Sequence, residues 1–260
     1  CRHAPAVRDR VMANLVFVTG DFCSGSTLLF TLFRKTGAYH CLYEPLHELL
    51  PEYTIWPLRA YEHHFFVKDY FAEYRGFGEL RRLFDPRWAT SGLYLPAEAE
   101  APALYRYLSY IIGASFGRRS KVMLKFNRAT FRLPWLRAKF PEAKIVHIYR
   151  DPEGQWNSNV RRVQSHVGRA DVGQDSPTFN GFNLATWCED LKVVFPELAV
   201  EQSPTGYERF LKLWQLSKSA GERYADISIE YRMLTHDFEA TCERIQRCVG
   251  RDFPLVSLKQ

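Results

Sequence analysis

The segment that most limits the fold of this chain lies near its N-terminus, at residues 15–33. It reads LVFVTGDFCSGSTLLFTLF: a β-branched apolar run that ends at Gly20, a loop of small residues, and a second apolar run that begins after Ser26 and Thr27. A short buried strand closed by glycine, followed by apolar residues at helical spacing, is typical of a strand–loop–helix unit. The segment therefore favours an α/β protein.

The alternation of strands and helices continues along the chain. Further strands are predicted at Lys121–Phe126, at Lys144–Tyr149 and within ADISIEY near the C-terminus. Helices are predicted at Ser26–Lys35, 104–116, within LPWLRAKF, from Asp151-Pro152 onward, at 184–195, 206–223 and 237–249, and over most of 53–84. This order predicts an α/β fold with a central parallel sheet flanked by helices. The length of 260 residues suits one domain over 1–260, of which about the first 12 residues can form a flexible tail.

The bulk composition narrows the function only a little. The 35 Lys and Arg against 29 Asp and Glu give a net charge of +6, which favours anionic ligands but is also common in soluble proteins. Six cysteines are scattered without CxxC pairs or Cys/His clusters, which argues against zinc and against a dense disulfide framework. We expect reduced thiols, although a Cys242–Cys248 bridge stays open as an alternative.

Localisation is inferred from what the sequence lacks. No apolar run reaches the ~18 residues of a membrane span, and the polar start CRHAPAVRDR does not look like a signal peptide. We therefore expect a cytoplasmic protein with no membrane span in this chain. A soluble domain cut from a membrane-anchored parent would have the same appearance and remains an alternative.

The loop after the first strand has the spacing of a phosphate-binding loop. Gly20 and Gly25 are five residues apart, and Ser26 and Thr27 follow. In the nucleotide-binding P-loop a Lys follows the second Gly, whereas this chain has Ser26. Backbone N–H groups of such a loop and helix start can still bind phosphate or sulfate. The missing Lys weakens the alternative of a P-loop kinase or NTPase. A tight turn without a ligand is the other alternative.

A second candidate anion-binding group follows the third predicted strand. That strand ends in IYRDP, which places Arg150 at the carboxyl edge of the sheet, where open α/β sheets bind ligands. Ser158 is eight residues further on, about two turns into the next helix. Arg150 could instead serve only to pair with Asp151.

Taken together, these segments resemble the sulfotransferases that use 3′-phosphoadenosine 5′-phosphosulfate (PAPS). The resemblance rests on SGST, FPEAKIVHIYRDPEGQWNSNV, MLKFNRATFRLPWLRAKFPEAKIV and ISIEYRMLTHDFEATCERIQRCVG. The resemblance is strongest to the bacterial and tyrosylprotein-type branch, whose members use a carboxylate as the general base. It implies a P-loop NTPase-like sulfotransferase fold, PAPS as donor with 3′-phosphoadenosine 5′-phosphate (PAP) as product, and no metal. The implied partner is a small-molecule or macromolecular hydroxyl acceptor rather than nucleic acid; oligomeric state is not implied.

The resemblance also implies roles for individual residues. In the family the first loop holds the 5′-phosphosulfate, the Arg and Ser of the later segment hold the 3′-phosphate, and a residue near the C-terminal strand approaches the adenine or the 3′-phosphate. Carried onto this sequence, the nucleotide-binding set is Phe22, Cys23, Ser24, Gly25, Ser26, Thr27, Arg150, Ser158 and Tyr231.

The chain departs from the family at Cys23, where a Lys or Arg normally neutralises the transferring group. The resemblance offers Lys125 as the replacement catalytic cation, with Arg128 as a second candidate. Transfer to a hydroxyl also needs a general base. By resemblance to the carboxylate branch, Glu44 takes this role.

Other assignments stay open. His40 and His47 are rivals for the general base, and a structural role for Glu44 is the remaining alternative. A non-catalytic protein that binds PAPS or PAP is an alternative to the enzyme, because Cys23 removes the usual cation. The acceptor is not specified, and we expect the aromatic-rich segment 53–104 to shape its pocket.

Overall fold

The computed structural model describes residues 13–55, 69–167 and 184–253. Its centre is a parallel sheet of five strands in the order β2-β3-β1-β4-β5. The strands are β1 (Leu15–Thr19), β2 (Tyr39–Tyr43), β3 (Lys121–Phe126), β4 (Lys144–Tyr149) and β5 (Ile227–Glu230). The predicted α/β fold with a central parallel sheet is confirmed.

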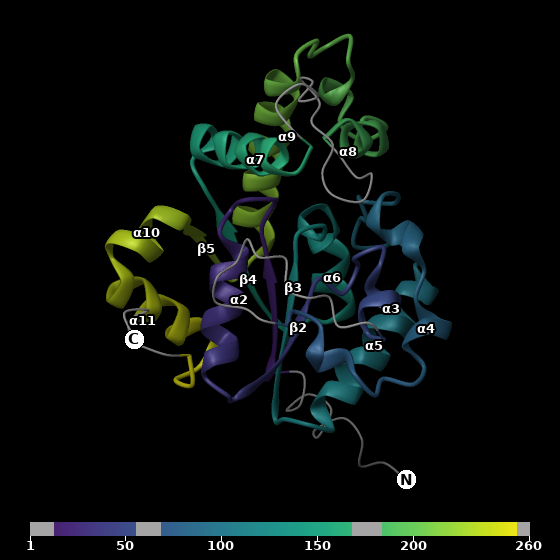
Figure 1. Cartoon of the computed structure of the whole chain (residues 1–260), viewed down its shortest axis with the longest axis vertical. Helices are drawn as coiled ribbons and strands as arrows, with labels where there is room; N and C mark the ends of the chain where they lie inside the picture. Colours follow the sequence, from purple (N-terminus) through teal and green to yellow (C-terminus); the bar gives the residue numbers. More distant parts are fainter. Residues whose placement is uncertain (1–12, 56–68, 168–183, 254–260) are drawn as a thin grey trace.

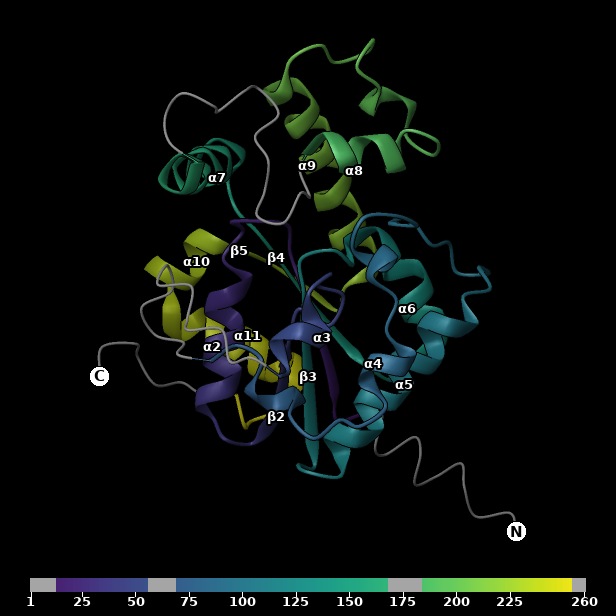
Figure 2. The same ribbon diagram turned by 45° about the vertical axis from the view of Figure 1, so that its right-hand side comes forward.

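Helices cover both faces of this sheet. Their bounds are α2 (Ser26–Lys35), α3 (Leu50–Tyr53), α4 (Leu80–Leu83), α5 (Pro102–Phe116), α6 (Leu133–Lys139), α7 (Pro152–Val167), α8 (Leu184–Leu191), α9 (Gly206–Tyr224), α10 (Tyr231–His236) and α11 (Phe238–Val249). In Figure 2, α2 and α11 lie on one side of the strands and α5 and α6 on the other. The chain therefore forms three layers, with the sheet in the middle.

The strands form where the sequence is apolar and β-branched on both faces. All five residues of β1 are buried, and four of the six residues of β4 are buried, as expected for strands covered by helices on each side. β2 was not predicted, because its sequence YHCLY mixes His and Cys into a short run. Tertiary contacts stabilise this strand instead, since β2 pairs with β3 along its whole length.

Local capping fixes the helices that border the site. Asp151 caps α7 as predicted, since its Oδ1 accepts a hydrogen bond of 2.6 Å from the Gly154 N–H and Pro152 begins the helix. Thr205 and Glu208 form a capping box at the start of α9. The helices that follow β4 and precede β5 therefore begin at defined points.

One predicted element is wrong. The segment 53–84 was expected to be mostly helical, but outside residues 56–68, which the structure does not describe, it contains only the end of α3, a 3₁₀ turn at Ala72–Tyr74 and the short helix α4. Its aromatic side chains pack against β2 and α5 instead, as Tyr43 and Tyr70 do with ring centroids 4.5 Å apart. These aromatic residues are spaced for contact with a neighbouring layer, and that spacing resembles the period of a helix.

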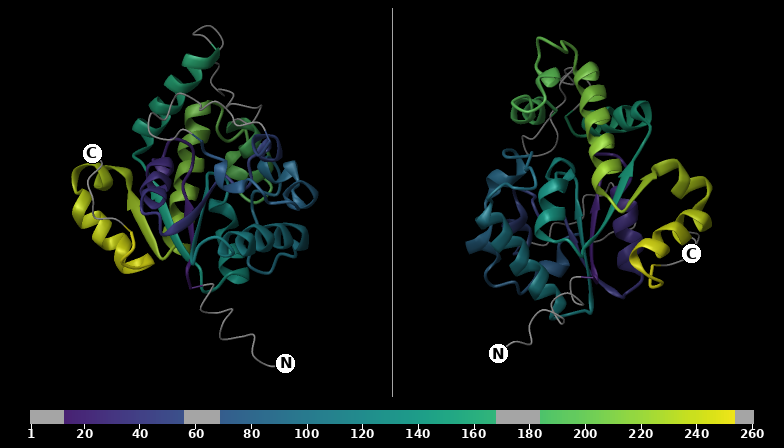
Figure 3. Two further views of the ribbon diagram at one scale, coloured as in Figure 1. Left: turned by 60° about the horizontal axis from the view of Figure 1, so that its bottom comes forward. Right: turned by 180° about the vertical axis from the view of Figure 1, so that it is seen from behind.

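The region above the carboxyl ends of the strands is built by α7, α8 and the upper half of α9 (Figure 1). Seen from behind, α9 runs from that region down across the sheet (Figure 3, right). A separate apolar cluster joins α8 and α9 to the residues after β3; its buried members are Leu93, Phe131, Trp187, Cys188, Leu191, Leu198 and Leu213. This cluster holds α8 in place over the sheet edge.

Two further observations concern the described residues as a whole. Cys23, Cys41, Cys188, Cys242 and Cys248 form no disulfide, so the Cys242–Cys248 bridge is not present. None of the helices in the described ranges is both long enough and apolar enough to cross a membrane.

Candidate active site

The loop between β1 and α2 is shaped by two close contacts. A Cβ at Gly20 would lie 2.4 Å from the carbonyl oxygen of Ile148, so only glycine fits beside β4. Gly25, with φ of 98°, has the left-handed conformation that glycine adopts readily. It directly precedes α2, whose first N–H groups have no partner within the helix. These groups face out of the loop as donors for an anion.

Ser24 adds a side-chain group to this loop. Its hydroxyl is buried, with 1% of the residue exposed, and among the described residues no hydrogen-bonding partner reaches its Oγ. A buried hydroxyl without a partner is unfavourable unless a ligand supplies one. The loop therefore fits an oxyanion such as a phosphate or sulfate group.

Tyr231, the last of the predicted nucleotide-binding residues, packs against the same loop. A Cβ at Gly25 would lie 2.2 Å from Cδ2 of Tyr231, so the ring packs directly on the glycine. The guanidinium of Arg150 also lies over this ring, with Cζ 5.0 Å from its centroid. Tyr231 therefore contacts both Gly25, at the start of α2, and Arg150, at the end of β4.

Two roles were predicted for Arg150, namely binding an anionic ligand and pairing with Asp151. Its Nε is 3.8 Å from Oδ2 of Asp151, which is a loose pair, while its backbone oxygen accepts a hydrogen bond of 2.9 Å from Nε1 of Trp214. The side chain is 27% exposed. Ser158 is partly buried on α7, the helix that Arg150 precedes. The guanidinium is therefore held at the sheet edge with donors still open to a ligand.

Lys125 and Glu44 form a buried ion pair next to the loop. The Lys125 Nζ bonds to Oε1 of Glu44 and, at 2.8 Å, to Oδ1 of Asn127. The other oxygen of Glu44 accepts from the Asn127 N–H at 3.0 Å. Asn127 Oδ1 also accepts from the Ser26 hydroxyl at 3.0 Å, which ties the pair to the first residue of α2. The two predicted catalytic residues are therefore brought together at the mouth of the loop.

The backbone at this site is strained at two points. Cys23 and Glu44, with φ of 61° and 45°, are the non-glycine residues in the described ranges that have positive φ. A non-glycine residue with positive φ destabilises the folded state by about 1–3 kcal/mol. Such a conformation persists where the surrounding contacts enforce it, often at functional sites. At Glu44 the enforcing bond is evident, because its N–H donates to the carbonyl oxygen of Lys125 at 2.8 Å.

Arg128, the second candidate cation, is engaged elsewhere. Its Nη1 donates to Oε2 of Glu48 at 2.5 Å and to the carbonyl oxygen of Leu46 at 3.3 Å. Its Cζ lies 5.8 Å from the ring centroid of Phe22, so it borders the loop from outside. Lys125 is the better placed of the two.

The rival histidines differ in position. His40 lies within β2, opposite Val122 and away from the carboxyl edge, and its Nε2 is 3.1 Å from the carbonyl oxygen of Glu73. His47 lies one turn after Glu44, and its Nδ1 accepts a hydrogen bond of 3.2 Å from the Leu49 N–H. Burial, with Arg128 and Lys125 nearby, lowers the pKa of His47 from 6.5 to about 3. His47 is thus near the site but is engaged by its own turn.

Two polar residues of the site were not predicted from the sequence. Asn127 joins Lys125, Glu44 and Ser26, as described above, and an Asn two residues after a candidate Lys is the signal that could have found it. Asp21 lies inside the loop, and its Oδ1 accepts a hydrogen bond of 3.3 Å from Thr130. Burial raises the pKa of Asp21 to about 6, although hydrogen bonds from Ser217 and Thr130 lower it in part.

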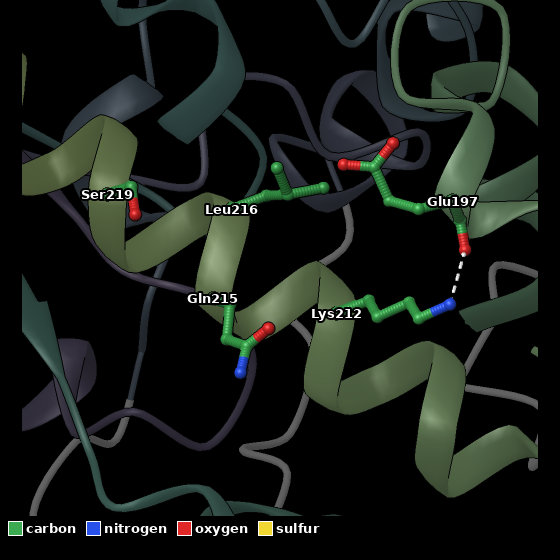
Figure 4. A pocket seen from close by; sticks show the side chains of 5 residues that line it. All are labelled: Glu197, Lys212, Gln215, Leu216 and Ser219. Carbon is green, nitrogen blue, oxygen red and sulfur yellow. Dashed lines mark hydrogen bonds between the residues drawn. The ribbon is translucent and has the colours of Figure 1, made fainter.

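The cavities of the described region separate into two places. One lies on the outer side of α9, lined by Glu197, Lys212, Gln215, Leu216 and Ser219, where the Lys212 Nζ donates to the Glu197 carbonyl oxygen at 3.3 Å (Figure 4). It contains none of the predicted site residues. At the other place two cavities both include Asp21 of the loop. One is lined by residues after β3 together with Leu93 and Trp187, and the other by Phe22 and residues of α7, α8 and α9.

Comparison with known proteins identifies the family of the chain. A family model described as the sulfotransferase family matches residues 15–254. The omega-hydroxy-beta-dihydromenaquinone-9 sulfotransferases Stf3 of Mycobacterium bovis and Mycobacterium tuberculosis are each 27% identical to this chain, over 68% of it and 52% of their own length. The chain therefore spans about half the length of these curated relatives. Since the family match extends from β1 to the end of the described residues, the chain belongs to the sulfotransferase family.

Proposed function

We propose that this protein transfers the sulfuryl group of PAPS to a hydroxyl of an acceptor, with Glu44 as the general base and Lys125 as the catalytic cation. Membership of the sulfotransferase family supports sulfuryl transfer. The observation that carries the residue roles is the buried Lys125–Glu44 pair, which Asn127 joins to Ser26 at the start of α2. A base and a cation are thus held beside an anion-binding loop.

The carboxylate of Glu44 keeps the capacity to accept a proton. Each of its oxygens carries two lone pairs, and the described contacts use one on Oε1 for Lys125 and one on Oε2 for the Asn127 N–H. An acceptor hydroxyl can therefore donate to the remaining positions. As its oxygen attacks sulfur, the proton passes to Glu44.

Lys125 supplies the positive charge that Cys23 does not. Transfer of a sulfuryl group, like phosphoryl transfer, depends on positioning and on compensation of charge at the leaving oxygen. Lys125 is fully buried, and in such surroundings a cation interacts more strongly with charge that develops nearby than it would in water. We expect the loop amides from Cys23 to Thr27 to share that charge.

The nucleotide half of PAPS fits the residues around Tyr231. The Arg150 guanidinium offers donors for a 3′-phosphate, and Ser158 on α7 is the predicted second contact. The aromatic ring of Tyr231 offers an apolar face for the adenosine. These residues bind and orient the donor and do not take part in bond breaking.

Activity of the purified protein with PAPS tests the proposal. Incubation with an alcohol or phenol should give PAP and a sulfate ester in equal amounts. If PAP binds tightly but no acceptor gives an ester, the protein is a nucleotide-binding protein and the catalytic roles are wrong.

A further inference from the structure

The cavity that begins at the loop is lined mainly by aromatic rings from three helices. We call it the tryptophan hollow; its lining residues are Asp21, Phe22, Gln155, Trp156, Asn159, Leu184, Trp187, Phe210, Leu213 and Trp214. They come from the loop and from α7, α8 and α9, which stand together above the sheet in Figures 1 and 2. The hollow is therefore built by the part of the fold that covers the site.

The tryptophan hollow borders a second cavity that reaches the neighbourhood of the proposed reacting groups. A smaller cavity, lined by Asp21, Leu93, Asn127, Arg128, Thr130, Phe131 and Trp187, shares Asp21 and Trp187 with it. Asn127 of that smaller cavity contacts both Lys125 and Glu44. The hollow is therefore adjacent to the cavity that Asn127 lines.

The walls of the hollow favour a flat apolar molecule. The Phe22 and Trp187 rings lie 5.2 Å apart between centroids at an interplanar angle of 38°, and the Trp156 and Phe210 rings are also 5.2 Å apart. Aromatic walls of this kind gain from burial of apolar surface and from offset ring contacts. A sugar ring has less apolar surface than an aromatic ring and would gain less from burial against these walls.

Within the described part of the chain, two buried side-chain oxygens in the lining of the hollow lack a hydrogen-bond donor. Gln155 is 2% exposed, and its Oε1 has no donor among the described residues; the same holds for the buried Oδ1 of Asn159. Asp21 adds a carboxyl group. The described lining of the hollow contains no Lys or Arg. An occupant that brings N–H or O–H donors would satisfy these oxygens, and an anion would find no counter-ion there.

We propose that the tryptophan hollow binds the acceptor, and that the acceptor is an apolar, ring-bearing alcohol or phenol without negative charge that carries a further N–H or O–H donor. This inference rests on the proposed function, because it assigns the second substrate of the same site. It differs from the expectation that segment 53–104 shapes the acceptor pocket, since Leu93 is the one residue of that segment in the described lining of the two cavities.

The test measures binding without transfer. Equilibrium dialysis of the protein saturated with PAP, in the absence of PAPS, gives the Kd of four probes: 2-naphthol, 6-amino-2-naphthol, 6-hydroxy-2-naphthoate and D-glucose. We expect 6-amino-2-naphthol to bind about 3- to 10-fold tighter than 2-naphthol, the worth of one added hydrogen bond. The naphthoate should bind more weakly than 2-naphthol, and glucose should not bind measurably. Equal or tighter binding of the naphthoate or of glucose would overturn the inference.

Three variants locate the binding in the hollow. Gln155→Leu keeps the size of the side chain and removes its amide, so 6-amino-2-naphthol should lose its advantage while 2-naphthol binds as before. Leu184→Asp places a charge in the lining and should weaken 2-naphthol about tenfold or more, because a buried charge is unfavourable beside an apolar ring. Val193→Asp, at a position 84% exposed and outside the hollow, is the control and should change nothing.

The outcomes separate this inference from the proposed function. Circular dichroism first confirms that each variant folds. If Gln155→Leu and Leu184→Asp both bind the naphthols as the wild type does, the acceptor lies elsewhere, even where the wild type transfers sulfate normally. If the naphthols bind in the hollow but no sulfate ester forms with PAPS, the binding inference stands and the enzymatic proposal fails.

Discussion

At the scale of single residues, the site is dominated by an ion pair between positions 81 apart in sequence, Lys125 and Glu44. Removing both charges from water is unfavourable, and a buried pair offsets this only with good geometry and additional hydrogen bonds. Asn127 supplies these bonds to both partners. A pair of this kind contributes little to net stability, so its presence is better explained by chemistry than by folding.

Replacement of Lys125 tests the cation. Lys125→Ala should lower kcat by about 100-fold or more, the usual effect of losing one group that stabilises a developing charge. The Kd of PAP should change much less, since Arg150 and Tyr231 remain. The measurements are steady-state transfer and calorimetric titration with PAP.

The matched control is Lys121→Ala. Lys121 begins the same strand at the opposite end of the sheet and pairs with Asp252. Its loss should leave kcat unchanged. Near-normal kcat in Lys125→Ala would remove Lys125 from the mechanism.

Replacement of Glu44 distinguishes the general base from its rival. Glu44→Gln should reduce kcat by about 10²- to 10⁴-fold, the range for loss of a general base. His47→Asn should have a small effect on kcat, because Nδ1 of His47 is engaged by the Leu49 N–H. The rates of both variants are compared under saturating PAPS. Full activity in Glu44→Gln together with loss of activity in His47→Asn would transfer the role to His47.

At the scale of elements, the loop between β1 and α2 depends on Tyr231, which begins α10. The ring fills the space that a side chain at position 25 would need. The strand–helix unit at the N-terminus and the C-terminal segment are thus fitted to one another at the candidate nucleotide site.

Two glycine substitutions measure this fit. Gly25→Ala meets the Tyr231 ring at 2.2 Å and also a φ of 98°, whereas Gly37→Ala meets a φ of 65° with no atom within 4 Å. Both should lose about 1 kcal/mol of unfolding free energy from the left-handed conformation. Gly25→Ala should lose more, and it alone should weaken PAP binding. The readouts are urea unfolding and PAP titration; equal losses in the two variants would show that the Tyr231 contact is unimportant.

Prediction from the sequence succeeded where a pattern is local. β1, β3 and β4 were placed with the observed bounds because each is mostly apolar and is followed by a turn or a charged residue. β2 was missed because its partner, β3, lies about 80 residues away in sequence, and the segment 53–84 was misjudged because its aromatic residues serve tertiary contacts. The roles of Asn127 and Asp21 depend on how three strand ends converge, which no local pattern records.

At the scale of the whole molecule, buried histidines link stability to pH. Burial lowers the pKa of His40 and of His147 from 6.5 to about 4 and that of His47 to about 3. Between pH 6.5 and pH 4 the unfolded chain therefore binds protons that the folded chain does not, and stability falls as pH falls. Asp21 acts in the opposite sense, because its raised pKa of about 6 gives stability that is lost as pH rises through 6.

Burial also raises the pKa of Glu73, so two carboxyl groups oppose three histidines. The histidines should dominate. The free energy of unfolding in urea should be lower at pH 5 than at pH 7.5. A free energy that is unchanged or higher at pH 5 would contradict the buried, neutral state of these side chains.

The central claim is that a loop without its usual cation still supports sulfuryl transfer because Lys125 and Glu44 lie beside it. The most direct measurement follows PAPS and 2-naphthol with wild type, Lys125→Ala and Glu44→Gln, quantifying PAP and naphthyl sulfate together. The account predicts equal amounts of the two products with the wild type and at least about 100-fold slower formation with either variant. Naphthyl sulfate formed at the wild-type rate by both variants would contradict it.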